Sequence, residues 1–259
     1  MPATDWGWLV TPEELRGWIL RETSDLLLLN KPPHVVCHRS RFGPWSSLVG
    51  ACREHFGDDI LRLPFRLDRE TSGVFVLART KETGSRLQRA VQVRGFRKTY
   101  HAVMTGHLTA PVTASGSIGP DTGAEFYSRR TVVEQDGQSA TTDFIPIASG
   151  GGFTLAQVHP HSGRRHQIRV HAASLGFPLV GDKLYGPDPT LMIRFMREGM
   201  SPELLHHLLL DRHALHCTRV DFETELGIET FSAPPPADLA GFVLTRIGVS
   251  WVAENSGQP

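Results

Sequence analysis

One aspartate stands out because charged and small polar residues surround it just before an apolar run. It is Asp68 in the stretch LPFRLDRETSGVFVLART, residues 63–80, with Arg66 and Arg69 on either side. A charge-rich turn ahead of a strand is commonly a solvated loop. A carboxylate held among arginines can instead stay ionised and react as a nucleophile or a base. The local sequence leaves both interpretations open.

A second polar stretch is HPHSGRRHQIRVH, residues 159–171, whose four histidines suggest a metal site. His166 and His171 are five residues apart, which puts them about 140° apart around a helix. No cysteine or acidic residue lies nearby at a zinc-like spacing, so we expect no metal. Arg165 and Arg169 are four apart and share a helical face, where an arginine can hold a carboxylate or a phosphate. An ordinary surface arginine is the alternative.

Tyr100 is a third candidate, within FRKTYHAVM at residues 96–104. Alternation predicts a strand there, with Lys98 and Tyr100 on the same face. A tyrosine is common in a sheet, but it can also stack on a nucleobase and use its hydroxyl in proton transfer. The sequence contains no P-loop, GxGxxG or GxSxG motif, and nothing in it marks a histidine or an aspartate as a partner for Ser72.

The strands that must position these residues do not alternate regularly with helices. Short apolar runs at 26–29 and 74–79 predict strands buried on both faces. Residues 110–152 are rich in Gly, Ser and Thr and predict short antiparallel strands and turns, while 153–159 alternates as a strand. The pattern favours an α+β fold with a mainly antiparallel sheet over a doubly wound fold.

Capping signals predict the helices. Thr80 can cap a helix that runs from Lys81 to about Gln92. Ser162 and Gly176 bracket a second helix, and leucine and methionine recur at helical spacing further along the chain. The second and third predicted helices span about 164–175 and 190–210.

Composition and charge narrow the class of protein. The 259 residues are 40% apolar and 21% charged, which is ordinary for a soluble globular protein. The net charge of zero hides a basic segment, 62–100, with ten basic and three acidic residues, and an acidic end, 221–259, with one basic and six acidic residues. Such a segment suits a nucleic-acid partner, although a mixed surface is the alternative.

The same composition predicts a cytoplasmic protein. No apolar run approaches the roughly 20 residues of a membrane span, and the acidic, polar N-terminus is unlike a signal peptide. The three cysteines are odd in number and widely spaced, which fits a reducing compartment.

Five segments taken in order resemble the RluA-type pseudouridine synthases. They are LLLLNKPP, FRLDRETSGVFVLART, RKTYHAVMTG, HSGRRHQIRVHAASLGFPLVGDKLYG and RHALHC. The resemblance implies a pseudouridine synthase fold, with a mixed and mainly antiparallel sheet, flanking helices and a central active-site cleft. It also implies isomerisation of uridine to pseudouridine in RNA without a cofactor or a metal.

The resemblance assigns roles to individual residues. Asp68 matches the catalytic aspartate, Tyr100 the active-site tyrosine, and Arg169 the arginine that pairs with the aspartate. Arg66 matches the arginine that fills the gap left by a flipped base. The residues expected to bind RNA are Arg66, Arg69, Arg86, Arg89, Lys98 and Arg165.

The reaction breaks the N1–C1′ bond, rotates the base and joins C5 to C1′. Flipping a base out of a stem costs a few kcal/mol, which basic residues on the phosphates help to offset. Asp68 could attack C1′, add to C6 or remove a ribose proton, and the sequence does not choose between these roles. Arg169 would keep Asp68 anionic against desolvation, and Tyr100 would stack on the base and take the C5 proton.

The resemblance covers about residues 25–250, which we expect to form the catalytic domain. Residues 1–24 are then an N-terminal extension too short for an S4-type domain, and 251–259 a tail. Phe65 stands where the family commonly has histidine, and Arg165 where threonine is common. Ribosomal RNA and tRNA are both plausible substrates, and a monomer is expected. The alternatives are a non-catalytic RNA-binding or RNA-folding protein on the same scaffold, and a small-molecule enzyme.

Overall fold

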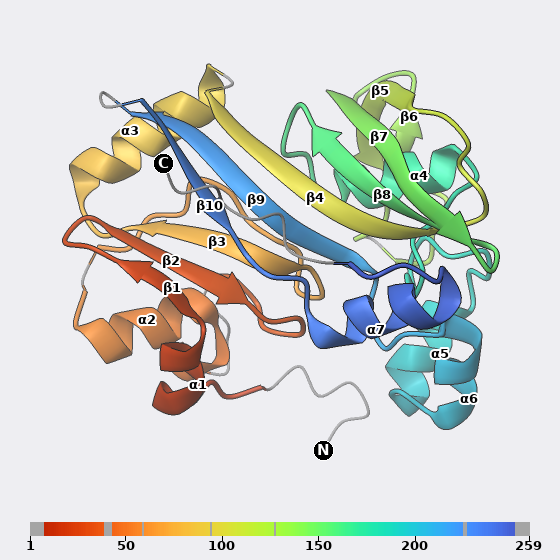
Figure 1. The fold of residues 1–259 in the computed structure, drawn as a ribbon, viewed down its shortest axis with the longest axis horizontal. Helices are drawn as coiled ribbons and strands as arrows, with labels where there is room; N and C mark the ends of the chain where they lie inside the picture. The colour runs from red at the N-terminus through yellow and green to blue at the C-terminus, as the bar shows by residue number, and fades with distance from the viewer. Residues whose placement is uncertain are drawn as a thin grey trace. The chain divides into compact units, whose positions relative to one another are not determined.

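The computed structural model describes residues 8–251 apart from 39–42, 59, 94, 127, 225 and 226 (Figure 1). It divides into two compact units that interleave along the chain. Among the described residues, unit 1 holds 99–215 and 236–251, and unit 2 holds 8–98 and 216–235. The chain passes between the units inside β4 (Phe96–Thr105), at the start of β9 (Leu215–Thr224) and again between residues 235 and 236. Residues 252–259 of the predicted tail lie outside the described residues.

Unit 2 is built on a sheet in which β2 (Leu26–Lys31) and β3 (Ser72–Ala78) are central. β3 pairs antiparallel with β2 and parallel with β9. The two predicted strands at 26–29 and 74–79 are confirmed, and their leucine and valine side chains are buried. The outer strands are β1 (Ile19–Glu22) and β10 (Gly227–Ser232), which pair antiparallel with β2 and β9.

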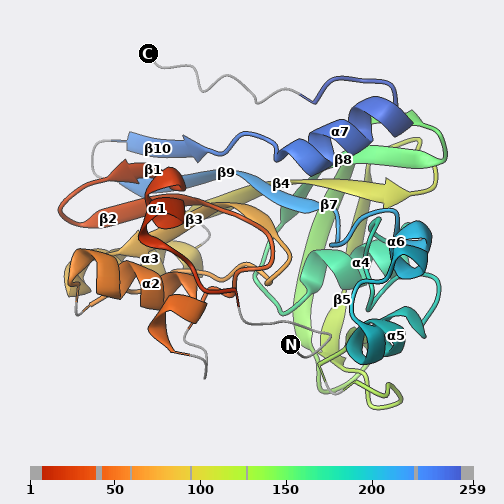
Figure 2. The same ribbon diagram turned by 90° about the horizontal axis from the view of Figure 1, so that it is seen from below.

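The helices of unit 2 are α1 (Pro12–Gly17), α2 (Leu48–Phe56) and α3 (Lys81–Gln92), with a 3-10 turn at Pro44–Ser46. α3 has the predicted bounds. The Thr80 hydroxyl accepts a hydrogen bond from the Thr83 N–H at 3.1 Å, which satisfies an otherwise unpaired donor of the first turn. α2 and α3 lie on the same side of the unit 2 sheet (Figure 2).

Unit 1 is built on an antiparallel sheet of order β4–β8–β7–β5–β6. This confirms the predicted strands between 96 and 159. The segment 110–152 contains one strand longer than expected, because β7 has 13 residues and pairs along its length with two neighbours. The remaining strands are β5 (Val112–Pro120), β6 (Arg130–Val133), β7 (Gln138–Gly150) and β8 (Phe153–Pro160).

Helices cover both faces of the unit 1 sheet (Figure 2). On one face, Val243 of α7 (Ala237–Arg246) packs in a cluster with Val103 and Leu155. On the other, Val170 of α4 (Gln167–Ser174) packs with Ile118 and other buried residues. The helical stretch predicted at 190–210 is interrupted at Gly199 and forms two helices, α5 (Leu191–Glu198) and α6 (Pro202–Leu208). The mixture of helices with a mainly antiparallel sheet confirms the α+β prediction.

The start of α4 corrects one prediction. The helix begins at Gln167 instead of near Arg164, and its N-cap is His166 in the left-handed region at φ 59°. Ser162 does not cap it; its hydroxyl donates to the Gln167 side chain at 2.7 Å. Gly176, at φ 82°, follows the C-terminus as predicted, because a left-handed residue after a helix favours glycine.

Candidate active site

Asp68 lies in unit 2, in a loop of residues 68–71 that leads into β3 and is called the Asp68 loop below. The N–H of Thr71 donates to the carbonyl of Asp68 at 3.1 Å and closes a turn. Leu67, directly before the loop, is buried, and Asp68 itself is half-buried. The carboxylate is therefore presented from a backbone that is anchored on its N-terminal side.

A buried lysine anchors the Asp68 loop. Lys31, the last residue of β2, is 0% exposed, and its Nζ donates to three carbonyls. They belong to Pro32 at 2.8 Å, Arg69 at 2.9 Å and Thr71 at 2.8 Å. An ammonium has three N–H donors, so each one has an acceptor, and two of these acceptors are in the loop. Sequence reasoning missed Lys31, although a lysine ending an apolar run indicates a buried, partnered cation.

Two further bonds fix the residues on either side of Asp68. The Cys37 thiol donates to the carbonyl of the residue before Asp68 at 3.1 Å, and Arg69 Nε donates to the carbonyl of His34 at 3.0 Å. Burial raises the pKa of the Cys37 thiol, so the thiol stays protonated and keeps its donor. The charge of Lys31 lowers this pKa and that of Asp68 raises it, both less than burial does.

The Ser-Gly pair after the loop is explained by contacts with β9. The Ser72 hydroxyl is 2.9 Å from His216 Nδ1, and both side chains are buried. Nothing in the sequence marked His216 as this partner. Gly73 has φ +116°, and a Cβ there would lie 2.1 Å from the Cys217 carbonyl oxygen. Only glycine fits this position, because both the backbone angle and the neighbouring strand exclude a side chain.

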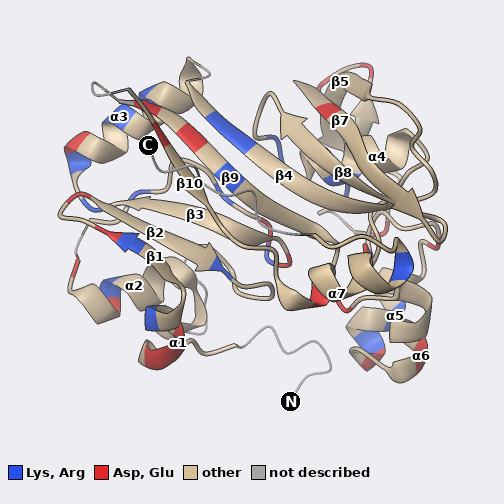
Figure 3. Ribbon diagram, in the orientation of Figure 1, with Lys and Arg blue, Asp and Glu red and all other residues tan. Residues whose placement is uncertain are grey.

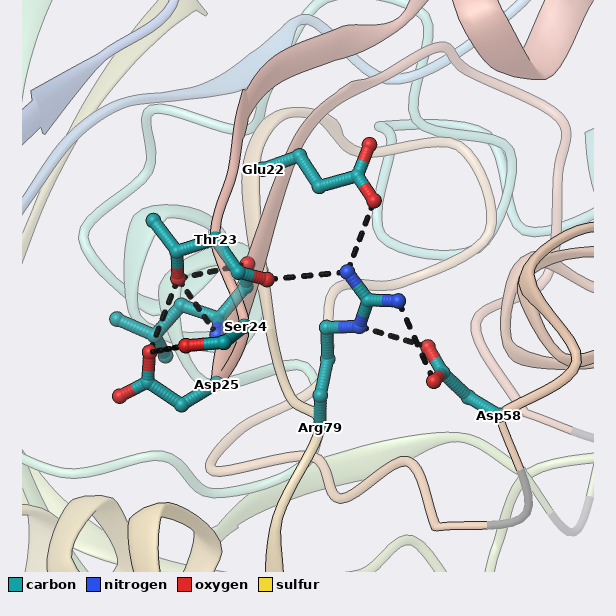
Figure 4. A network of polar contacts seen from close by, with 7 residues as sticks. Glu22, Thr23, Ser24, Asp25, Asp58 and Arg79 are labelled. Atoms are coloured by element: carbon teal, nitrogen blue, oxygen red, sulfur yellow. Dashed lines mark hydrogen bonds and ion pairs between the residues drawn. The ribbon is translucent and has the colours of Figure 1, made fainter.

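The far end of β3 is held by a charged cluster (Figure 4). Arg79 donates from Nε to Asp58 at 2.8 Å and from Nη1 to Glu22 at 2.8 Å. It also donates to the carbonyl of Thr23 at 3.0 Å. Side-chain contacts therefore hold both ends of β3.

Arg169 lies in unit 1, on α4, and grips a buried carboxylate. Its Nε and Nη2 donate to the two oxygens of Asp182 at 2.7 and 2.8 Å. The Asp182 side chain is 0% exposed. Burial alone would raise the pKa of Asp182, but the charge and hydrogen bonds of Arg169 outweigh it and lower this pKa to about 2. The pairing of Arg169 with Asp68, which belongs to the other unit, stays a prediction.

Tyr185 supports the same arginine. The Arg169 guanidinium carbon lies 4.9 Å from the centre of the Tyr185 ring, a cation–π distance, and that of Arg129 lies at 5.7 Å. The Tyr185 hydroxyl accepts from the Arg130 N–H at 2.9 Å and is 2.8 Å from His166 Nδ1. The sequence analysis singled out neither Asp182 nor Tyr185, although an acid and an aromatic residue stand together between two glycines in GDKLYG, residues 181–186.

Arg165 does not share a helical face with Arg169, so that prediction is wrong. Arg165 precedes α4 and is exposed, whereas Arg169 is inside the helix and only 8% exposed. Gln167 causes the difference, since its side chain accepts from the Arg164 N–H at 3.1 Å and delays the start of the helix.

Tyr100 lies in β4 of unit 1, opposite Val158 of β8, and is 6% exposed. Tyr100 is therefore a buried residue of the sheet, and its contact with a base stays a prediction. Its neighbour in sequence, His101, is also buried, with its ring centre 5.3 Å from that of Trp251.

Most of the residues expected to bind RNA are in unit 2. Arg66 and Arg89 are exposed, and Arg86 is half-buried. Lys98 sits 5.3 Å from the Phe65 ring, and burial lowers its pKa. Basic segments mark α3 and the first part of β4 in Figure 3. Arg165 is the exception, in unit 1.

Each histidine of the 159–171 stretch has its own protein partner. These pairs are His159 with Gln157, His161 with Asp143, His166 with Tyr185 and His171 with Thr142. Within the described ranges, no three His, Cys, Asp or Glu side chains gather as a metal site would require. Nor does any described helix have the length and apolar character needed to cross a bilayer.

An aspartate on a pinned loop in an α+β fold with a mainly antiparallel sheet is the arrangement expected of an RNA uridine isomerase. The family described as RNA pseudouridylate synthase matches residues 25–174. The chain belongs to this family, whose members isomerise uridine to pseudouridine in RNA, and it is an enzyme of that kind. The resemblance seen in the sequence is thereby confirmed.

Curated relatives agree. The chain is 32% identical over 235 residues to the ribosomal large subunit pseudouridine synthase D of Salmonella typhimurium, covering 87% of this chain and 69% of that protein. It is 31% identical to the Escherichia coli protein of the same name, covering 90% and 71%. An uncharacterized RNA pseudouridine synthase of Bacillus subtilis is 33% identical, covering 91% and 74%.

A solved structure, human RNA pseudouridylate synthase domain containing 1, superposes with a TM-score of 0.67 at 25% identity. The match covers 92% of this chain and 90% of that one. Human RNA pseudouridylate synthase domain containing 4 has the same fold, with a TM-score of 0.64 at 22% identity over 89% and 93% of the two chains. These likenesses confirm the predicted pseudouridine synthase fold.

Proposed function

We propose that this chain makes pseudouridine in large-subunit ribosomal RNA, in the cytoplasm, with Asp68 as its catalytic carboxylate. The target is supported by the names of its Salmonella and E. coli relatives. The catalytic assignment is carried by the Asp68 loop, whose backbone is held by a buried lysine, a buried thiol and an arginine. So many anchors on one surface turn suit a residue that must meet a reacting atom within a fraction of an ångström.

Asp68 would act at the sugar or the base while the N1–C1′ bond opens. It attacks C1′, adds to C6 or removes a ribose proton, and all three roles need the ionised carboxylate. Enclosure with RNA would favour the neutral form, and a nearby cation opposes this. Lys31, whose Nζ donates to two carbonyls of the Asp68 loop, is proposed as such a cation.

Arg169 would be the second cation at the carboxylate, and Tyr100 would stack on the base and take the C5 proton after C5 joins C1′. A guanidinium has five N–H donors, so the grip of Arg169 on Asp182 is compatible with a second acceptor. We expect Arg169→Met to cripple activity and, to a smaller extent, stability. Full activity in this variant would exclude the ion pair.

RNA would be held by the predicted basic residues of unit 2 together with Arg165. Arg66 would fill the gap left by the flipped base, and Arg69, Arg86, Arg89 and Lys98 would contact phosphates or the sugar. Because the isomerisation is redox-neutral, we expect it to need no metal or cofactor. We also expect the protein to be a monomer. The three buried free cysteines support a reducing compartment.

The test is to map pseudouridine in total ribosomal RNA and tRNA after incubation with the purified protein. Asp68→Asn serves as the parallel variant, with RNA affinity measured for both. We expect new pseudouridine in large-subunit RNA from the wild type only, while both proteins bind RNA alike. New pseudouridine in tRNA alone would overturn the ribosomal target, and turnover by Asp68→Asn within tenfold of the wild type would overturn the role of Asp68.

A further inference from the structure

In unit 1, Tyr185 joins two segments that carry arginines. Tyr185 brings together two segments that are distant in the chain, because its hydroxyl meets both the N–H of Arg130 on β6 and Nδ1 of His166 before α4. Arg164 and Arg165 directly precede His166 and are exposed. The segments that carry Arg130, Arg164 and Arg165 therefore meet at one aromatic side chain, and we call these three residues the arginine cluster.

The cluster is not neutralised by acidic side chains. Arg164 donates only to a backbone carbonyl, that of Ser139, at 3.3 Å, and within the described part of the chain Arg130 and Arg165 form no ion pair. The neighbouring Arg129 differs from these three arginines, because it forms an ion pair with Asp121. Arg129 thus stays with its carboxylate and its contact with the Tyr185 ring, and supports the site without adding a free charge.

Arg130 shows a feature that points to a ligand. Its Nε is buried, and no acceptor lies within reach of it among the described residues. A buried donor without an acceptor costs roughly 1–3 kcal/mol. Such groups in native structures call for a missing partner. A phosphate oxygen that draws the guanidinium outward relieves this cost and gains a charge-assisted hydrogen bond.

We propose that the arginine cluster is a phosphate-binding site that holds the RNA backbone beside Arg169. Tyr185, whose hydroxyl joins the segments of the arginine cluster, also has its ring 4.9 Å from the Arg169 guanidinium carbon. The arginine cluster and Arg169 are therefore linked through one residue. Arg165 is already expected to bind RNA; Arg130 and Arg164 are new, and so is their shared support. The ligand is the phosphodiester, and the cluster reads no base. This inference rests on the proposed function, since it takes RNA as the partner.

Equilibrium binding of total ribosomal RNA, measured from low to high salt in the Asp68→Asn background, tests the site without turnover. Replacing Arg130, Arg164 and Arg165 together by Gln should flatten the plot of log affinity against log salt by about 2 units of slope, since each phosphate contact contributes roughly 0.7–0.9. Replacing all three by Lys should keep most of the slope, because a phosphate accepts a point charge.

Arg197→Gln and Arg246→Gln are the matched controls. Both residues are exposed in unit 1, and each substitution removes one charge outside the arginine cluster. An unchanged slope in the triple Gln variant, or a loss no larger than that of the controls combined, would overturn the site. If the wild type makes no pseudouridine but the triple variant still loses slope, the proposed function fails and the site stands. If pseudouridine forms and the slope is unchanged, the site alone fails.

Discussion

Each unit contributes a buried cation to the candidate site, Lys31 in unit 2 and Arg169 in unit 1, and the two cations have different partners. In unit 2, Lys31 donates to three backbone carbonyls. In unit 1, Arg169 donates to both oxygens of one carboxylate, Asp182. Bonds to carbonyls fix the course of the chain, whereas a bidentate bond to a carboxylate fixes the orientation of a side chain.

This difference matches what each unit must present. Unit 2 presents Asp68 from a loop, so it is the backbone that needs to be held. Unit 1 presents the Arg169 guanidinium from a helix. The helical backbone is already regular, so only the side chain has to be oriented. The variants below test this division, in order of decreasing expected effect.

Lys31→Met should have the largest effect. It removes one partner from three carbonyls, each of which then costs roughly 1–3 kcal/mol if left unsatisfied. We expect the free energy of unfolding to fall by about 3–5 kcal/mol and activity to be nearly lost. Denaturant unfolding and pseudouridine assays measure both. Lys81→Met, at the exposed start of α3, is the control; equal behaviour of the two variants would mean that Lys31 does not hold the loop.

Asp182→Asn should come next. It keeps the shape of the side chain but leaves Arg169 without a buried anion, at a cost of about 3 kcal/mol. Activity should fall mainly through kcat, because Arg169 is misdirected while the RNA surface is intact. Glu203→Gln breaks the exposed pair with Arg194 and should cost less than about 1 kcal/mol. A neutral result for Asp182→Asn would show that Arg169 is held by other contacts.

Acid should weaken unit 1 through His101. Burial, with a smaller contribution from His159, lowers the pKa of His101 to about 4, from 6.5 for an ordinary histidine. The fold therefore favours the neutral ring; its contribution is complete above pH 6.5 and is lost as the pH falls toward 4. We expect a loss of about 2–3 kcal/mol between pH 7.5 and 4.5.

His101→Gln should flatten that dependence, and the exposed His107→Gln should leave it unchanged. The stability of unit 2 should instead change at alkaline pH. Burial raises the pKa of Cys52 from 9.0 to about 12, so its contribution is complete below pH 9 and is lost as the pH rises toward 12. Equal acid sensitivity in wild type and His101→Gln would contradict the assignment.

Tyr185→Phe should have the smallest effect. It keeps the ring against Arg169 but removes the hydroxyl from Arg130 and His166, at a cost of about 1 kcal/mol. Tyr185→Leu also removes the ring and should cost more and lower kcat further. Thermal unfolding and single-turnover assays compare the two. A Leu variant no worse than Phe would mean that the ring does not support Arg169.

Local signals predicted the fold well. The Thr80 cap, the buried strands of unit 2 and the alternation of β4 all depend on residues within a few positions of one another. The start of α4 was misplaced because the Gln167 side chain accepts hydrogen bonds from the Ser162 hydroxyl and the Arg164 N–H ahead of the helix. Its amide also donates to Thr141 and Thr142 on a strand that is distant in the sequence.

The supports of the site were not predictable in the same way. Ser72 meets His216 across 144 residues, and Lys31 meets Arg69 across 38. Such pairs leave no periodicity in a single sequence, so each looked like an ordinary residue of its own segment. The resemblance to a family supplied Asp68, Tyr100 and Arg169, but it said nothing of Asp182 or Tyr185, which reach Arg169 through the fold.

The parallel pairing of β3 with β9 also sets an order of events during synthesis. His216 must be made before Ser72 can bond to it, and at roughly 5–20 residues per second those 144 residues take a ribosome about 7–30 seconds. Residues 99–215 of unit 1 are synthesised in that interval, and residues 236–251 of the same unit follow later. Ser72 and Gly73, which directly follow the Asp68 loop, are therefore made early but gain their contacts with β9 late.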